Sequence, residues 1–158
     1  MKRSILLACF TILVIVTSVY ADQNCKPVEG HFEASVVPPG QGHCPPVDGT
    51  LCTAGRVWGG IQGNYQFIAT GFFPSGAVPT VFFFTGKSTI FLKSDDQLLG
   101  TDTGSIDLFG LGGFASLITF SGGTGEMSTA TGQIRLRGQF SAAAGTTAGD
   151  YLGTLCSQ

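Results

Sequence analysis

The chain has 158 residues and a formal net charge of −2, and only 11% of its residues are charged. Soluble domains typically carry about 25% charged residues, so we expect this surface to draw its polarity from serine, threonine, glutamine and glycine. No basic cluster is present in the sequence, which argues against nucleic acid or an anionic membrane surface as a partner.

Residues 1–21 have the composition of a signal peptide. Lys2 and Arg3 form a basic start, an apolar run covers residues 5–16, and Ala21 supplies the small residue that signal peptidases require before the cleaved bond. We expect cleavage after Ala21. Residues 22–158 then form a single domain with one core, in a secreted, periplasmic or otherwise extracellular protein.

Two other interpretations of this segment stay open. An uncleaved anchor would need an apolar run long enough to span a hydrocarbon core of ~30 Å, and residues 5–16 are short for that purpose. The motif Leu6-Leu7-Ala8-Cys9 resembles a lipoprotein signal but comes early in the apolar run. We therefore expect no membrane association once the signal is removed.

Short strands bounded by turn residues follow along the rest of the chain. The sequence holds 24 glycines and 7 prolines, and no stretch after residue 21 shows an uninterrupted helical period of apolar residues. The pattern predicts eight or nine strands, and the candidate segments are residues 30–37, 56–61, 64–73, 78–85, 87–93, 97–108, 113–120, 132–141 and 150–156.

The short links predict that consecutive strands pair in an antiparallel manner. Closing such a meander into a barrel removes both exposed sheet edges, and eight strands give an interior that holds side chains or one small ligand. We therefore predict an all-β fold, a single eight-stranded antiparallel β-barrel with two disulfides. Phe72-Phe73 and Phe82-Phe83-Phe84 place aromatic rings on both faces of their strands. The outward rings need a cover, such as the N-terminal loop or a second subunit in a homo-oligomer.

Four cysteines remain after the signal, at positions 25, 44, 52 and 156. An even number in an exported chain indicates two disulfides, and three pairings are possible. We favour Cys44–Cys52, which closes a short proline-rich loop, and Cys25–Cys156, which ties the two ends of the domain. A metal site is not expected, because the sequence has no CxxC pair and only two histidines, His31 and His43.

The segment from Asp102 to Cys156 resembles the allene oxide cyclase and dirigent family of small β-barrels. The similarity lies in a Gly-rich turn, the strands around it and the last strand, and it involves Asp102-Thr103-Gly104-Ser105-Ile106, residues 114–120, Gly122-Gly123-Thr124-Gly125, residues 130–136 and Asp150-Tyr151-Leu152-Gly153. Members of this family are exported in the dirigent branch, are usually oligomeric, and hold reactive apolar intermediates in a productive shape.

The family's functional residues do not transfer to this chain. Dirigent proteins have arginines after the Gly-Thr-Gly turn, where this chain has Ser128 and Thr131, and the cyclases have an aromatic residue at the position of Thr131. The resemblance therefore implies the barrel more strongly than any particular chemistry.

Four polar residues in predicted strands are candidates for a site in the lumen. Glu33 and Asp107 are carboxylates in largely apolar strands, where a carboxylate could act as an acid or base, Tyr65 has a polar tip on a packing ring, and Arg135 lies opposite Ile134 in its strand. Each has an alternative: Glu33, Asp107 and Arg135 as surface charges, and Tyr65 as a packing residue. No nucleotide-binding loop, catalytic triad or calcium loop is present, and no cofactor is expected.

Three functions follow from this sequence. The leading one is a secreted barrel that binds a small, largely apolar molecule in its lumen. The second is a cyclase or isomerase of the allene oxide cyclase or dirigent type, which acts on a lipid-, polyketide- or phenol-derived intermediate. The third is a structural or surface-interaction protein whose barrel is filled by its own side chains.

Overall fold

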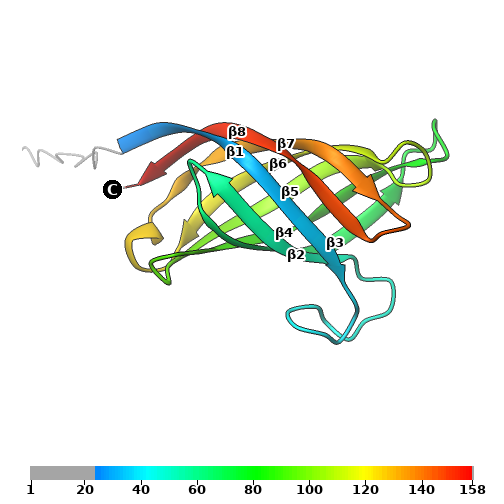
Figure 1. Ribbon diagram of the computed structural model, residues 1–158, viewed down its shortest axis with the longest axis horizontal. Coiled ribbons are helices and arrows are strands. Elements are labelled where there is room, and N and C mark those ends of the chain that lie inside the picture. The colour runs from blue at the N-terminus through cyan, green and yellow to red at the C-terminus, as the bar shows by residue number, and fades with distance from the viewer. Residues whose placement is uncertain (1–23, 158) are drawn as a thin grey trace, which may run out of the picture.

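A computed structural model describes residues 24–157 of the chain, and the predicted signal peptide lies outside these residues. The described part consists of eight strands and one 3₁₀ turn (Figure 1). Their bounds are β1 (Asn24–Val37), β2 (Cys52–Gly59), β3 (Gly63–Pro74), β4 (Val81–Leu92), β5 (Gln97–Asp107), β6 (Gly113–Gly123), η1 (Gly125–Met127), β7 (Thr131–Ser141) and β8 (Thr146–Ser157).

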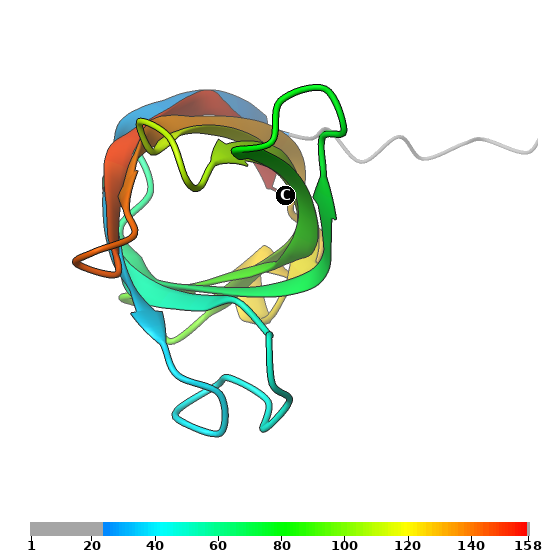
Figure 2. The same cartoon turned by 90° about the vertical axis from the view of Figure 1, so that its right-hand side faces the viewer.

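The eight strands form one closed antiparallel barrel in sequence order, which confirms the predicted fold class. Closure comes from β1 and β8, which pair from Asn24 opposite Ser157 to Ser35 opposite Thr146. Viewed along its length, the sheet forms a complete ring (Figure 2). Because every described strand pairs with two neighbours, the barrel has no edge strand, although the overhanging start of β1 pairs with β8 alone.

Some strand bounds differ from the prediction. Residues 78–85 and 87–93, predicted as two strands, form the single strand β4, which runs through Gly86. A glycine is required there because a Cβ at this position would lie 2.2 Å from the ring of Phe67. The strands β1 and β8 both extend beyond their predicted limits, because their mutual pairing at the closure supplies hydrogen bonds that no local pattern reveals.

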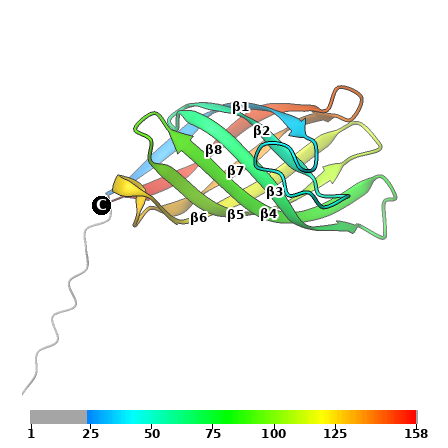
Figure 3. The same cartoon turned by 90° about the horizontal axis from the view of Figure 1, so that it is seen from below.

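The two ends of the barrel differ. One end, here called the terminal end, carries both ends of the described chain, the β2–β3 and β4–β5 turns and η1 (Figure 3). The other, here called the loop end, carries the connections 38–51, 75–80, 108–112 and 142–145.

Side chains alternate between the lumen and the outer wall with a period of two, as expected for strands. At the terminal end the lumen is filled with aliphatic and aromatic side chains, and those of Ile90, Leu98, Ile118 and Ile134 are almost completely buried. Tyr151 closes this end further: its hydroxyl accepts a hydrogen bond from the Ile61 backbone N–H at 2.8 Å and donates one to the Ile61 carbonyl at 3.1 Å.

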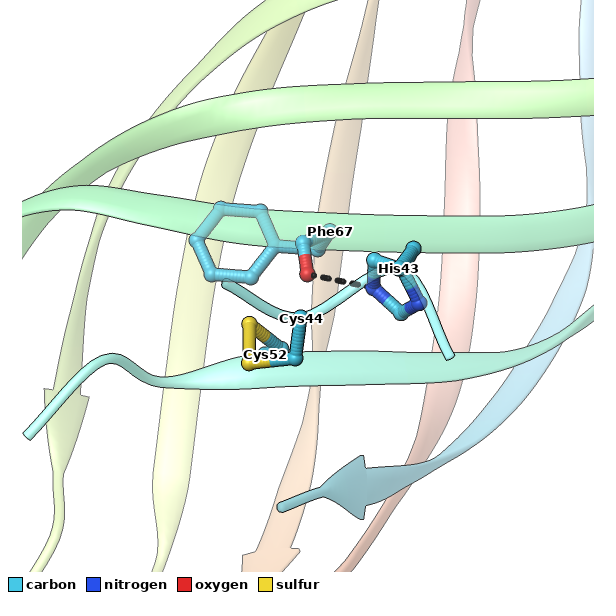
Figure 4. The surroundings of a disulfide bond; sticks show 4 residues. All are labelled: His43, Cys44, Cys52 and Phe67. Carbon is cyan, nitrogen blue, oxygen red and sulfur yellow. Dashed lines mark hydrogen bonds between the residues drawn. A yellow bond between two sulfur atoms is a disulfide. The ribbon is translucent and has the colours of Figure 1, made fainter. Parts of the chain in front are cut away.

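Both predicted disulfides are present. Cys25 and Cys156 are register partners on β1 and β8, so their bond crosses the closing seam of the barrel. Cys44 and Cys52 hold the 38–51 loop against the start of β2, and in the same loop His43 Nε2 lies 3.2 Å from the Phe67 carbonyl oxygen, which accepts its hydrogen bond (Figure 4). Two disulfides fit a protein of an oxidising compartment. Within residues 24–157, no helix has the length and apolar character needed to cross a membrane.

Candidate ligand pocket

The loop-end half of the lumen contains a cavity of about 60 Å³. Its walls are predominantly aromatic and aliphatic, formed by Phe32, Leu51, Phe67, Phe84, Ile106, Phe114, Leu136 and Phe140, with Thr53, Tyr65, Asp102, Ser116 and Thr147 as polar members. A single water needs roughly 10–15 Å³ on such a measure. The cavity therefore has room for a few waters, or for one end of a ligand whose remainder lies in the opening.

The cavity opens toward the loop end. Leu51, Phe114, Phe140 and Thr147 lie at strand ends beside the loops and are only half-buried. Tyr65 and Asp102 lie deeper in the lumen and are buried. The 38–51 loop supplies Leu51 to the wall, so the Cys44–Cys52 disulfide fixes one side of the opening.

A polar cluster forms the inner part of this pocket. Asp102 Oδ2 accepts hydrogen bonds from the Ser88 hydroxyl at 3.1 Å and from the Tyr65 hydroxyl at 3.5 Å, and these two hydroxyl oxygens are 3.2 Å apart. The second carboxylate oxygen, Oδ1, is buried and accepts no well-aligned hydrogen bond from residues 24–157, although the Ser116 hydroxyl lies close enough to act on the carboxyl group. Buried polar atoms nearly always have a partner, so an unpartnered oxygen beside a cavity indicates a place where a ligand donor can bind.

Burial controls the ionisation of this cluster. Asp102 is 2% exposed, and loss of hydration raises the pKa of its carboxyl group to about 6, although the hydroxyls of Ser116, Ser88 and Tyr65 oppose the shift. Burial, followed by the nearby Asp102 charge, raises the pKa of Tyr65 well above its ordinary value. Tyr65 is therefore a neutral hydrogen-bond donor, whereas Asp102 changes its charge close to neutral pH.

The alternation of β5 explains why Asp102 lies inside. The inward positions of this strand are Leu98, Gly100, Asp102, Gly104 and Ile106. The glycines on either side leave room for neighbouring rings: a Cβ at Gly104 would lie 2.7 Å from the Phe84 ring. Asp102 thus projects into the lumen between two positions that carry no side chain.

The four candidate residues from the sequence are dispersed. Tyr65 lies in the lumen and contacts Asp102, as the lumen hypothesis required. Glu33 lies on the outer wall, opposite Arg56 in the β1–β2 register, and Arg135 also lies on the outer wall. The structure therefore brings only Tyr65 to the pocket.

Asp107 holds the turn that follows its own strand. Its Oδ2 accepts a hydrogen bond from the Leu111 backbone N–H at 2.8 Å, within the turn between β5 and β6. A hydrogen bond from the Thr80 side chain, followed by that from Leu111, lowers the pKa of this carboxyl group. Asp107 is the last residue of β5, half-buried and outside the pocket.

Asp102, Ser88 and Ser116 were not among the site residues predicted from the sequence. The alternation of the strand could have indicated Asp102, because this residue lies on one face together with the apolar Leu98 and Ile106. Asp107 lies on the opposite face. Ser88 and Ser116 carry no comparable signal, since buried serines are common and only the barrel places them next to Asp102.

The arrangement can hold an apolar body against five phenylalanine rings and bind one donor group at Asp102 Oδ1. It contains no side-chain cation, and within residues 24–157 no group of three or more His, Cys, Asp or Glu side chains could hold a metal ion.

The chain matches no protein-family model, no curated protein and no solved structure. The resemblance to the allene oxide cyclase and dirigent family therefore stays a prediction.

Proposed function

We propose that this protein, exported after loss of residues 1–21, binds a small, largely apolar molecule in the loop-end half of its lumen, with a hydroxyl group of that molecule donating to Asp102. The observation that carries the proposal is the unpartnered Asp102 Oδ1 beside an otherwise apolar cavity. Apolar walls with a few oriented polar groups are typical of small-molecule sites. The family resemblance of the C-terminal half supports the same reading.

Charge and aromaticity narrow the class of ligand. A carboxylic acid would bring a second anion next to Asp102 at neutral pH, so we expect neutral alcohols and phenols rather than free acids. Five phenylalanine rings line the cavity, and two of their pairs, Phe32–Phe114 and Phe67–Phe84, meet edge to face. A phenol would add a further ring to this set.

The test uses phenol, anisole and benzoate as matched probes, titrated by calorimetry and by NMR of the lumen aromatic protons. Phenol can donate to Asp102, anisole has the same ring without a donor, and benzoate adds a negative charge. We expect phenol to bind about tenfold or more tightly than anisole, since a buried acceptor without a donor costs roughly 1–3 kcal/mol, and benzoate not to bind at neutral pH.

Asp102→Leu should abolish the preference for phenol over anisole, whereas Asp48→Asn, which alters an exposed carboxylate in the 38–51 loop, should leave it unchanged. Native mass spectrometry of the purified protein would reveal any ligand that co-purifies. If no probe shifts the lumen resonances and no ligand co-purifies, the barrel is a self-filled structural protein and the proposal fails.

A second candidate function is catalysis, favoured by one observation. Asp102 has a pKa of about 6 and lies where bulk water does not reach it, as a general acid or base requires. Its carboxylate could remove a proton from a bound molecule and return it at another carbon, the proton transfer needed for an isomerisation. Conversion of a β,γ-unsaturated cyclic ketone to its conjugated isomer, followed by ultraviolet absorption, tests this. The rate should rise as pH passes about 6 and be lost in Asp102→Asn.

A further inference from the structure

Large apolar side chains are exposed on three separate connections at the loop end. Phe73 and Val78 belong to the β3–β4 hairpin tip, Phe109 and Leu111 to the β5–β6 connection, and Val47 to the 38–51 loop. The exposed fractions of Phe109 and Leu111 are 70% and 91%. Viewed along the barrel, these connections stand around its opening (Figure 2). Exposed apolar side chains that gather at one end of a molecule indicate an interaction surface.

The same end carries almost no charge. Residues 72–86 and 138–149 contain no Asp, Glu, Lys or Arg, and residues 104–118 contain only Asp107, whose carboxylate is engaged by its own turn. Asp48 is the only such residue in the 38–51 loop. Charged side chains are frequent at the terminal end instead, with Lys93, Asp95 and Asp96 in the β4–β5 turn and Glu126 in η1. The molecule is therefore amphipathic along its length.

We propose that the loop end docks on an electrically neutral lipid surface, with Phe73, Phe109 and Leu111 in the apolar region and the pocket opening toward the lipid. The absence of lysine and arginine from the loops removes the attraction that anionic headgroups exert on basic surfaces. Apolar side chains alone then provide the binding energy, as in proteins held at a membrane interface by buried apolar area.

The shape of the surface favours lipid over a rigid partner. The exposed apolar side chains belong to three connections around the opening rather than to one continuous face. A deformable surface accommodates such separated points without shape complementarity. Beyond the loops the outer wall mixes exposed apolar side chains, such as Phe83 and Leu152, with the charged Glu33, Arg56 and Arg137. Burying these charges in lipid would be costly, so we expect the loops to enter the lipid and the strands to stay outside it. An apolar ligand could then pass between the lipid and the pocket without crossing water.

This proposal departs from the expectation of no membrane association, which considered anionic surfaces and spanning segments only. It does not depend on ligand binding. A filled lumen would refute the proposed function and leave docking intact, and a failure to dock would leave ligand binding intact.

The first test is flotation of the purified protein with phosphatidylcholine vesicles. We expect the wild-type protein to float, and Phe109→Ser with Leu111→Ser to weaken binding about tenfold or more for each side chain removed. The matched control is Leu99→Ser with Leu152→Ser, which removes two exposed leucines from the barrel wall and should float like the wild type. Adding phosphatidylglycerol to the vesicles or raising the salt concentration should change little, because the loops carry no Lys or Arg.

The second test reports on location. Phe109→Trp in a Trp58→Phe background places a single tryptophan at the loop end, whereas the native Trp58 lies near the β2–β3 turn at the terminal end. Vesicles should shift the fluorescence of the introduced tryptophan to shorter wavelength and leave that of Trp58 unchanged in the wild-type protein. The proposal is overturned if the wild-type protein does not float, if the loop variant floats equally well, or if the protein is a dimer that the loop variant alone dissociates.

Discussion

At the scale of single residues, Asp102 determines how the interior responds to protons. Its carboxyl group titrates near 4 in an unfolded chain and at about 6 in the barrel, because burial disfavours the charged form and no Lys or Arg pairs with it in the described residues. The folded state therefore binds a proton more tightly than the unfolded state, and ionisation of Asp102 destabilises the fold.

The sign of the pH dependence follows from this difference. The folded-state pKa is raised, so the contribution of Asp102 to stability is most favourable at acid pH and is lost as pH rises from about 4 through about 6. The loss amounts to about 3 kcal/mol, the free energy that separates a pKa near 4 from one of about 6. Urea denaturation between pH 4 and pH 7 measures it. Asp102→Asn should flatten this dependence and be the more stable variant at pH 7, whereas Asp48→Asn should retain it. Equal pH dependence in both variants would contradict the assignment.

The comparison of Asp102 with Asp107 also shows what the sequence could establish about the site. Because β5 is continuous through Gly104, its alternation places Asp102 and Asp107 on opposite faces of the sheet. Residues 97–108 were predicted as one strand, but Gly100 and Gly104 lie on the same face as Asp102, so that face has a weak apolar pattern in the sequence. The partners of Asp102 come from β3, β4 and β6, and no local pattern relates residues so far apart in the chain.

At the scale of elements, strand existence was predictable and strand extent was not. Period-two patterns located every strand, and the aromatic residues of β3 and β4 were correctly expected on both faces. The division of β4 at Gly86 was wrong, because a glycine that accommodates a ring from the neighbouring strand looks in sequence like a strand terminator. Both disulfide pairings were predictable, since one short loop and one pair of ends suffice to define them.

The two disulfides should have separable effects. Cys25–Cys156 closes a loop with a sequence separation of 131 residues and Cys44–Cys52 one of 8. On the chain-entropy model their removal costs about 5 and about 2.5 kcal/mol respectively. Paired Cys→Ser variants in urea denaturation should show this order of stability. Phenol affinity should show the reverse order, because only Cys44–Cys52 fixes a wall of the pocket. The same order in both measurements would refute this division.

At the scale of the whole molecule, the lumen is divided between a filled half and a hollow half. Leu98 and Ile118 are fully buried at the terminal end, whereas Phe114 and Phe140 line the cavity and are half-buried. Tight packing makes large-to-small changes costly where neighbours surround a side chain on all sides, and less so beside an existing void.

Two alanine substitutions measure this division. Leu98→Ala should lower the free energy of unfolding by about 2–5 kcal/mol and leave phenol affinity nearly unchanged, because it opens a void remote from the pocket. Phe140→Ala should cost less stability and weaken phenol binding. Thermal denaturation and calorimetry on the same samples provide both values. Comparable loss of stability in the two variants would show that the cavity half is packed as tightly as the other.

Pairing of the first strand with the last has a consequence for how the molecule is made. During synthesis or export the amino-terminal strand emerges first, yet its neighbour at the seam is the final segment to appear. Until that segment arrives, one side of β1 and one side of β7 offer free backbone groups to any passing strand. Wrong pairing at these two edges is therefore the main hazard until β8 is in place.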